Sequence, residues 1–339
     1  MKIPYKYLII ILLTILLILF FVSLVVGRFS VSISDIFGIL GYRFFSRIIP
    51  INQTWEPISQ NVILHLRLPR IFAAILIGAA LSTAGATYQG LFRNPMVSPD
   101  FLGVSSGAAI GASIAFVLNL SFQMVQILAF FGGIIAVLLT TAIPKILRND
   151  SIAVLVLSGI VVSGLFGSIM SIIRYIANPV TALPQIIFWQ MGSLATVTMQ
   201  EVFAIFIPIL ISLFVLTKIS WWLNIISLGE GQSVILGLNY KFYRFIGIIF
   251  STILAILSVS VAGQVGWIGL AIPHFARLLV GVDNKKIMPI CILTGAIFML
   301  LVDTLARTIT AGEIPLSVLT GFLGAPFFLF LIYKQRKKI

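Results

Sequence analysis

Few side chains in this sequence could carry out chemistry, and they lie far apart. The two histidines, His65 and His274, have no cysteine or carboxylate neighbours at the spacing that metal ligands need. The single cysteine, Cys291, lies in an apolar run and has no partner for an intrachain disulfide. No Gly-x4-Gly-Lys-Ser/Thr sequence occurs, which excludes ATP binding through a P-loop on this chain. These features argue against an enzyme and predict no metal and no cofactor bound by this chain.

Arginine is the residue type that could act in recognition. Arg67 and Arg70 lie close together near the start of one apolar run, and Arg307 follows the end of another. A guanidinium group presents a planar fork that suits carboxylates, so these three residues could dock an acidic partner or ligand. They could equally reach lipid phosphates or pair with Asp303 and Glu313 of the same chain. The charge pattern alone leaves both interpretations open.

The elements that position these residues are apolar helices. The chain has 339 residues, 60% hydrophobic and 9% charged, with a mean hydropathy of +1.16. Soluble domains are about a quarter charged, which excludes a soluble enzyme. Since about 20 apolar residues cross a bilayer, we expect an all-α integral membrane protein with about ten transmembrane helices. The predicted spans are 8–27, 70–91, 103–120, 124–143, 151–173, 202–219, 243–262, 264–281, 287–303 and 315–333, and 183–196 is expected to be re-entrant or interfacial.

The basic residues predict the orientation, because cytoplasmic loops carry an excess of Lys and Arg. With ten spans and the N-terminus inside, every lysine falls on the cytoplasmic side, whereas the opposite side has seven arginines and no lysine. Both termini are therefore predicted to be cytoplasmic. The residues on that side are Lys2, Lys6, Lys145, Lys218, Lys241, Lys285, Lys286, Lys334, Lys337, Lys338, Arg93, Arg148, Arg244, Arg277 and Arg336.

Several predicted spans are interrupted by proline and small residues. Proline ends helices, and irregular backbone at membrane depth is tolerated only inside protein or along a cavity. Because such breaks occur in both halves of the chain, they favour a transporter over an inert scaffold. Close helix packing explains most of these positions. The candidates for lining a pathway or forming hinges are Asn94, Pro95, Gly103, Ser105, Ser106, Gly107, Gly164, Gly266, Pro273 and Gly324.

The longest loop predicted to be cytoplasmic covers 220–242. Trp221 and Trp222 are typical of anchors at the membrane interface. The amphipathic stretch after them has no basic residue before Lys241, whereas a helix that binds lipid is rich in Lys and Arg on its polar face. We therefore expect this stretch to enter a groove on a partner protein. A helix lying on the bilayer is the alternative.

Three blocks of sequence resemble the FecCD-type permease family, the membrane subunits of ABC importers for iron-siderophores, haem and vitamin B12. The first block contains RLPR at 67–70, GAALSTAGATYQ at 78–89 and PDFLGVSSGA at 99–108. The second is GWIGLAIPHFARL at 266–278. The third contains DTLAR at 303–307, EIPL at 313–316 and GFLGAPFF at 321–328. The blocks run in family order, and the resemblance extends over nearly the whole chain.

The resemblance implies one permease domain over 1–339 with ten spans, in the cytoplasmic membrane of a prokaryote. It implies a second permease subunit, two ABC ATPase subunits and an extracytoplasmic substrate-binding protein as partners. It makes Arg67, Arg70 and Arg307 the docking positions for acidic residues of that binding protein. Coupling to the ATPases is assigned to Ser227, Leu228, Gly229, Glu230, Val234, Leu236 and Gly237.

The resemblance also implies a transport mechanism in which ATP hydrolysis by the partner subunits drives alternating access. An iron(III)-siderophore is the expected cargo, with haem and cobalamin as alternatives. An ion-coupled secondary carrier is a more distant alternative, because such carriers place acidic residues inside the membrane and most of the nine acids here fall in loops or at span ends. A membrane-embedded enzyme would need a polar cluster at one depth, which the sequence does not show.

Overall fold

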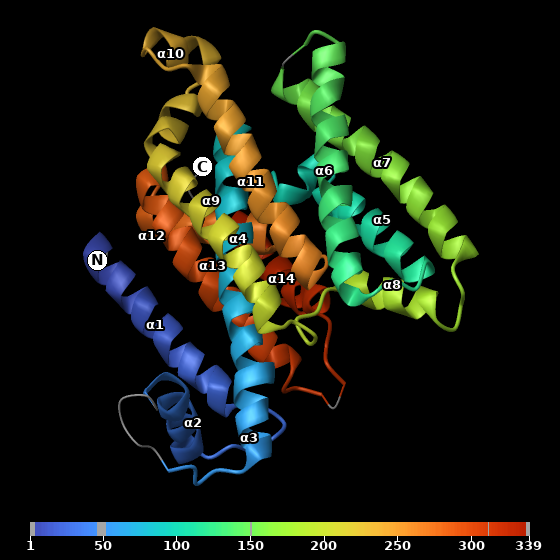
Figure 1. Ribbon diagram of the computed structural model, residues 1–339. Coiled ribbons are helices and arrows are strands. Elements are labelled where there is room, and N and C mark those ends of the chain that lie inside the picture. The colour runs from blue at the N-terminus through green and yellow to red at the C-terminus, as the bar shows by residue number, and fades with distance from the viewer. Residues whose placement is uncertain (1–3, 46–51, 150, 311, 337–339) are drawn as a thin grey trace.

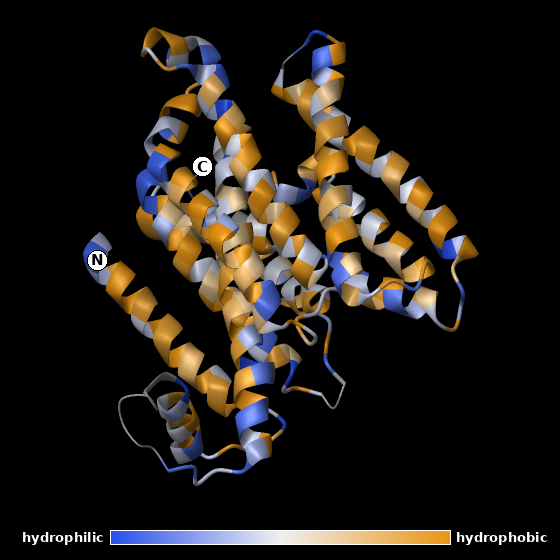
Figure 2. Ribbon diagram, viewed as in Figure 1, coloured by the Kyte–Doolittle hydropathy of each residue, from blue (hydrophilic) through white to orange (hydrophobic). Residues whose placement is uncertain are grey.

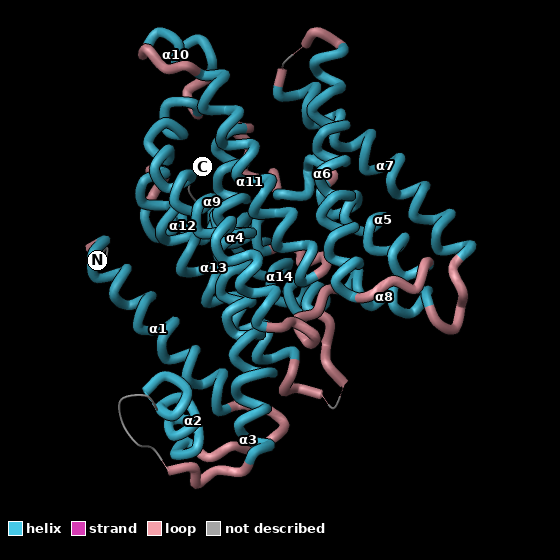
Figure 3. The backbone as a smooth tube through the Cα atoms, viewed as in Figure 1, coloured by secondary structure: helices cyan, strands magenta, loops and turns pink. Residues whose placement is uncertain are grey.

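The structure is a computed structural model that describes residues 4–45, 52–149, 151–310 and 312–336. This part of the chain is helical and contains no strand (Figure 3). The elements are α1 (Tyr5–Val25), α2 (Ile33–Phe45), α3 (Pro57–Asn61), the π-helix η1 (Val62–Arg67), α4 (Leu68–Leu91), the 3₁₀-helix η2 (Pro99–Leu102), α5 (Val104–Val117), α6 (Phe122–Ile146), α7 (Ile152–Ile176), α8 (Ala182–Met191), α9 (Met199–Ile226), α10 (Glu230–Ile235), α11 (Tyr240–Ala262), α12 (Ile268–Val280), α13 (Asn284–Ala306) and α14 (Leu316–Arg336).

Helix α4 forms the centre of the bundle, packed against α9, α11, α12 and α13. Its small residues let the backbones approach closely, which drives helix association where lipid tails are as apolar as the side chains. A Cβ added to Gly78 would lie 2.2 Å from the carbonyl oxygen of Gly295 on α13. A Cβ added to Gly85 would lie 1.9 Å from the carbonyl oxygen of Gly269 on α12. These glycines are therefore required for packing.

Seven helices of the described residues are long and apolar enough to cross a membrane: α1, α4 with the turns that precede it from Pro57, α6, α7, α9, α11 and α13. The chain is therefore a multi-pass membrane protein. Three apolar helices, α5, α12 and α14, are shorter. Helices α5 and α12 are short because irregular backbone precedes each of them, at 92–103 and at 263–267. The predicted breaks in the two halves of the chain thus lie at these positions.

Each predicted span coincides with a helix, but two parts of the prediction are wrong in detail. The loop predicted over 220–242 is shorter, because α9 continues through Ile226 and α11 begins at Tyr240. Trp221 and Trp222 therefore lie within α9, whose residues 209–226 contain no Gly or Pro that would end the helix earlier. Helices α2 and α3 were not expected, because the segment between the first two predicted spans has no long apolar run that would predict a helix. The segment 183–196 overlaps the ten-residue helix α8, which begins one residue earlier.

The helices form a main bundle around α4 and a second group, α5 to α8, beside it (Figure 1). With the shorter helices α5 and α12 included, successive apolar helices run in alternating directions, which gives the molecule two ends. We call them the α10 end, with α10 and the α6–α7 and α12–α13 turns, and the α2 end, with α2, α3 and the segment after α13. Hydrophilic residues gather at both ends, and hydrophobic residues cover the helices between them (Figure 2). The predicted cytoplasmic residues Lys2, Lys337 and Lys338 lie outside the described residues.

Candidate functional site

Arg70 lies in a buried cluster of charges at the α2 end. Its Nε donates a hydrogen bond of 2.6 Å to Asp303, and its Nη1 donates one of 2.7 Å to Glu313. The Arg70 side chain is 8% exposed, that of Asp303 is fully buried and that of Glu313 is 28% exposed. Hydrogen bonds between ionised groups are about twice as strong as neutral ones. Arg70 thus joins α4 to α13 and to the segment that follows α13.

Arg307 completes the cluster from the end of α13. Its Nε lies 3.8 Å from Oδ2 of Asp303, and its Nη2 donates to the carbonyl and hydroxyl oxygens of Ser23 on α1. Burial lowers the pKa of the Arg307 guanidinium to about 10, with Asp303 opposing that shift, so the group stays protonated at neutral pH. Arg307 therefore ties α1 to α13 as a cation.

Arg67 is bound to the same end of α1 without any acidic partner among the described residues. Its guanidinium donates to the carbonyl oxygens of three residues: Leu24, Val25 and Phe29. The residue is 4% exposed. Arg67 is the last residue of the π-helix η1, and α4 follows it directly. This arginine therefore fixes the chain that leaves α1 against the start of α4.

These contacts favour the second interpretation of the three arginines, in which they bind groups of the same chain. All three guanidinium groups are buried and bonded within the chain, and Arg70 pairs with Asp303 and Glu313, as the alternative interpretation expected. In this conformation they do not present a surface to an acidic partner. Docking by Arg67, Arg70 and Arg307 stays a prediction, and it would require the cluster to open.

Two other arginines at the α2 end are exposed, and the sequence interpretation did not select them. Arg28 follows α1 and donates a hydrogen bond of 3.0 Å to the carbonyl oxygen of Thr310. Arg43 lies in the last turn of α2. The amphipathic pattern of 33–45 is the signal that could have identified the second of them. Both offer charge at the surface that the buried cluster lacks.

The α10 end shows the opposite arrangement, with apolar side chains in the open. Leu228 is 52% exposed, Val234 59%, Ile235 85% and Leu236 59%. They flank or belong to α10, a short helix between α9 and α11 (Figure 1). Ser227, Glu230 and Gly237 of the predicted coupling set are also exposed. The segment therefore presents an apolar surface with no partner among the described residues, although its coupling role stays a prediction.

Backbone and side-chain hydrogen bonds hold α10 against the end of α9. The hydroxyl of Ser233, which is fully buried, donates to the carbonyl oxygens of Ile225 at 3.0 Å and Gly229 at 2.6 Å. Gly229 has a φ of 112°, a conformation that side chains rarely adopt, and an added Cβ there would lie 3.1 Å from Nη1 of Arg93. Glycine is thus required where the chain turns from α9 into α10.

A polar clamp joins the end of α9 to the start of α13 next to α10. The side-chain amide of Asn224 donates to Oδ1 of Asp283 at 2.8 Å. Its oxygen accepts from the backbone N–H of Asn284 at 2.8 Å and from the Asn284 side chain at 2.9 Å. These bonds, with that of Ser233 to Ile225, fasten α9, α10 and α13 together.

The predicted pathway residues on α5 lie at a junction of irregular backbone. Gln264, in the break before α12, donates a 3.1 Å hydrogen bond to the carbonyl oxygen of Ser105. The Ser105 hydroxyl donates to Asp100 in η2. Gly103 takes a φ of 77° between η2 and α5, with its added Cβ 3.3 Å from the Ser163 hydroxyl on α7. The two breaks therefore meet, as expected where irregular backbone is buried in protein.

The other pathway candidates fall into three groups. Gly107 and Gly324 lie at close approaches, where an added Cβ would come 2.2 Å from the Gly132 carbonyl oxygen and 2.6 Å from Cβ of Trp267. Asn94 and Pro95 lie in an exposed turn, Ser106 is half-buried, and Pro273 is buried within α12. Gly164 and Gly266 have nothing within 4 Å of an added Cβ. Their role in a pathway stays a prediction.

Helix α7 splits its small residues between two faces. Gly159 packs inward, with an added Cβ 1.9 Å from the carbonyl oxygen of Phe101. Gly164, Gly167 and Ser168 are exposed and face open space. Small residues in membrane helices usually mark an interface with another helix. This face of α7 has no such helix among the described residues.

No group of three or more His, Cys, Asp or Glu side chains that could hold a metal ion occurs in the described part of the chain. Multi-pass helices and two breaks in the helices that contact one another are typical of a membrane transport subunit.

Comparison with known proteins identifies the family. The model of the FecCD transport family matches residues 15–334. The chain is 37% identical over 316 residues to the molybdate import system permease protein MolB of Haemophilus influenzae, covering 93% of this chain and 92% of that protein. It is 33% identical over 295 residues to the hemin transport system permease protein HmuU of Yersinia pestis, covering 85% of this chain and 87% of that protein.

A third relative, a protein of Helicobacter pylori named as an iron chelatin transport system permease, is 40% identical over 275 residues, or 81% of this chain and 83% of that protein. A solved structure described as an inward-facing conformation of a metal-chelate type ABC transporter matches with a TM-score of 0.86 and 36% identity. That match covers 97% of this chain and 99% of the other.

The chain belongs to the FecCD transport family and is an ABC transporter permease, which confirms the resemblance. It is a transport subunit and not an enzyme, because ATP hydrolysis in these transporters resides on separate subunits. This membership removes the secondary carrier and the membrane-embedded enzyme from consideration.

Proposed function

We propose that this chain is the permease of a binding-protein-dependent importer that moves an iron(III)-siderophore across the cytoplasmic membrane of a prokaryote. One observation beyond the family supports the ATP-driven part of the proposal, namely the exposed apolar surface of α10 and its flanks, Leu228 and Val234 to Leu236. A short amphipathic helix without basic residues suits a hydrophobic groove on another protein. The ATPase subunit is the partner that an importer needs at this end.

The proposed topology has ten spans in one domain over 1–339, with both termini and the α10 end in the cytoplasm. Seven long helices and the three shorter ones, α5, α12 and α14, supply the crossings. The α10 end carries Lys145 in the last turn of α6, Lys241 in the first turn of α11 and Lys285 in the first turn of α13, whereas the charged residues of the α2 end are arginines and acids. The positive-inside rule favours the α10 end as cytoplasmic.

The proposed assembly contains two permease subunits, two ATPase subunits and one extracytoplasmic binding protein. The exposed small residues Gly164, Gly167 and Ser168 support α7 as the face that meets the second permease. The exposed charges of Arg28 and Arg43 support contact with acidic residues of the binding protein at the α2 end. The buried arginine cluster would then hold together the helices beneath that contact.

The proposed mechanism is alternating access without a cofactor on this chain. ATP binding by the partner subunits would move α10, and the Asn224–Asp283 clamp would pass the movement to α9 and α13. The junction of the two breaks, around Ser105 and Gln264, is placed to change shape as the helices tilt. Coupling of this kind requires that each partner bind the two states with different affinity.

Two cargoes are supported by the relatives of this chain, an iron(III)-siderophore and molybdate. An iron(III)-siderophore is supported by the relative named for iron chelatin and by the structural match to a metal-chelate type transporter. Molybdate is the second candidate, because MolB covers more of this chain at 37% identity. Hemin and cobalamin are the cargoes named for further relatives.

Uptake by the reconstituted importer tests the proposal. The permease is inserted into proteoliposomes with an ATPase and a binding protein from the same organism, and ⁵⁵Fe-siderophore, molybdate, hemin and cobalamin are supplied in parallel. We expect ATP-dependent uptake of the iron chelate and none of the other three. Uptake of molybdate alone would replace the cargo, and uptake without ATP would contradict the importer.

A further inference from the structure

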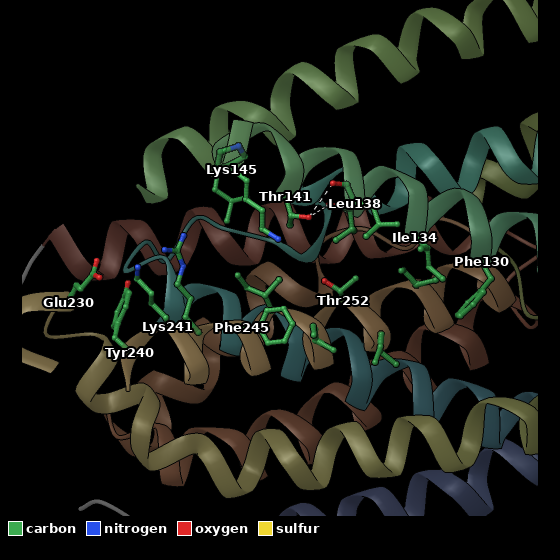
Figure 4. A pocket seen from close by; sticks show the side chains of 18 residues that line it. Phe130, Ile134, Leu138, Thr141, Lys145, Glu230, Tyr240, Lys241, Phe245 and Thr252 are labelled. Atoms are coloured by element: carbon green, nitrogen blue, oxygen red, sulfur yellow. Dashed lines mark hydrogen bonds between the residues drawn. The ribbon is translucent and has the colours of Figure 1, made fainter. Parts of the chain in front are cut away.

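A cavity of about 550 Å³ lies between α6 and α11, where the second helix group meets the main bundle. Its size falls within the range of small-molecule sites. Figure 4 shows Lys145, Lys241 and Tyr240 toward one end of the cavity and Phe130 and Ile134 at the other. The walls between them are formed by apolar residues of both helices: Val137, Leu138, Phe245, Ile248, Ile249, Ile253 and Ile256.

The cavity is charged at one end only. Lys145 on α6 and Lys241 and Arg244 on α11 line the end beside α10, together with the single acid Glu230. Even without Arg244, the two lysines outnumber the one acid. Lys145 and Lys241 are exposed, and neither has an acidic group within 4 Å in the part of the chain that the structure describes. This end therefore suits a negatively charged group.

The rest of the cavity offers nothing polar to a ligand. The Thr141 hydroxyl donates to the carbonyl oxygens of Val137 and Leu138, within its own helix. The Thr252 hydroxyl lies 2.7 Å from that of Tyr88 in the core. Since the two hydroxyl groups of the wall are already bonded, the wall recognises hydrocarbon. A polar metal chelate in transit would find no partner there.

The dimensions fit a lipid better than a compact solute. Phe130 and Lys145 are 15 residues apart on α6, which at about 1.5 Å per residue places them about 22 Å apart along the helix. One leaflet contributes about 15 Å to the hydrocarbon core of a bilayer. Leu138 and Phe245 are 62% and 60% exposed, so the groove is accessible from outside the protein. It thus runs from a cationic end through the depth of one leaflet.

We propose that this groove binds one anionic phospholipid, with its phosphate at Lys145, Lys241 and Arg244 and an acyl chain along α6 and α11 toward Phe130. The inference rests on the proposed topology, which puts the cationic end in the cytoplasmic leaflet, where anionic lipids gather. The lipid bridges the α5–α8 group and the main bundle beside α10. It would therefore stabilise the arrangement of these two helix groups that the structure shows.

The test uses native mass spectrometry of the full chain, purified in detergent with equal amounts of phosphatidylglycerol and phosphatidylcholine of the same acyl chains. Wild-type protein is expected to retain phosphatidylglycerol preferentially. The double variant K145Q/K241Q should lower the ratio of retained phosphatidylglycerol to phosphatidylcholine about 25-fold, because each cation near an anionic lipid is worth about fivefold. The matched control is K218Q. Lys218 is an exposed lysine in the half of α9 nearer to α10, and it does not line the groove. This variant should leave the ratio of the two retained lipids unchanged.

A second variant and a second probe address the apolar part. Ile134→Trp fills the groove and should reduce retention of both lipids, whereas glycerol phosphate, which lacks acyl chains, should displace neither. An unchanged ratio in K145Q/K241Q, an equal loss in K218Q, or displacement by glycerol phosphate would overturn the lipid site. The ATPase subunit is coexpressed with the permease, and its copurification is measured on the same samples. Intact copurification with no lipid preference overturns the lipid site alone, whereas wild-type protein without ATPase contradicts the proposed function.

Discussion

The two ends of the molecule differ in which side chains are buried: charged ones at the α2 end are buried, and apolar ones at the α10 end are exposed. At the α2 end, Arg67, Arg70 and Arg307 are charged groups in a buried position, and each is bonded within the chain. At the α10 end, Val234 to Leu236 are apolar groups in an exposed position with nothing described that covers them. The three arginines thus bind within the chain, although Nε of Arg307 and Oδ2 of Asp303 make no hydrogen bond among the described residues. The apolar residues of the α10 end have no such partner. Exposed apolar side chains are here the better guide to where a partner binds.

The largest effect is expected from removing the acid at the centre of the arginine cluster. Asp303→Ala leaves Arg70 and Arg307 buried without their shared carboxylate, and breaking a buried pair in this way costs about 3–5 kcal/mol. The melting temperature of the purified protein in detergent should fall sharply. Glu313→Gln is the control, since its partly exposed pair should contribute only about 1 kcal/mol or less. Equal melting temperatures for both variants would contradict a structural role for the cluster.

The next effect tests the other end and should change binding rather than stability. Val234→Glu combined with Leu236→Glu places two charges where an apolar groove is expected, so the affinity for the ATPase should fall at least about 30-fold, the value of one interface hot spot. Exposed positions tolerate such changes in folding to within about 0.5 kcal/mol. Copurification of tagged ATPase measures the loss.

The matched control for that variant is Ile309→Glu, at an apolar position that is 56% exposed at the α2 end. It should leave ATPase binding unchanged. If both variants lose the ATPase equally, or neither does, the assignment of α10 as the coupling element is wrong.

A smaller effect on stability is expected from alanine substitutions at Gly229 and Gly231, which should act in opposite directions. Gly229→Ala forces a side chain onto a φ of 112° and toward Arg93, at a cost of about 1–3 kcal/mol. Gly231→Ala, within α10 and with nothing near its added Cβ, should stabilise by up to about 1 kcal/mol. Thermal unfolding of the two variants should move in opposite directions. A shift in the same direction would mean that α10 is not held in this conformation.

The smallest effect concerns the exposed arginines. Arg28→Glu should slow association with the binding protein severalfold, mostly at low salt, because exposed charges at the edge of an interface act on the association rate. Its melting temperature should match that of wild type, whereas Arg67→Glu should unfold at a lower temperature because it is buried. Stopped-flow association at two salt concentrations measures the first effect. Normal stability of Arg67→Glu with slower association would instead favour docking by the buried cluster.

Most of the helices could be predicted from the sequence, because long apolar runs determine them directly. The breaks before α5 and α12 were predictable for the same reason, since Pro95, Pro99 and the glycines at 263 and 266 interrupt those runs. The extent of α9 was not, because nothing local distinguishes a helix that continues past Trp222 from one that ends there. Helix α2 was missed because its pattern is amphipathic rather than apolar.

The binding partners of Arg67, Arg70 and Arg307 could not be predicted, because they lie far away in the sequence. Arg70 meets Asp303 over a separation of 233 residues, and Arg307 meets Ser23 over 284. The pairing with Asp303 and Glu313 was one of two interpretations, and only the fold brings these groups together. The α10 surface was predictable in composition, but its exposure follows from Ser233 and Leu238 packing inward.

Hydrogen–deuterium exchange on the permease with and without its ATPase tests the contrast between the ends most directly. We expect the backbone amides of 227–239 to become at least tenfold better protected when the ATPase binds, while those of the buried cluster around Arg67 and Asp303 keep the protection they already have. Unchanged exchange over 227–239, with the ATPase shown to be bound, would contradict α10 as the coupling element and with it the account of how this permease is driven.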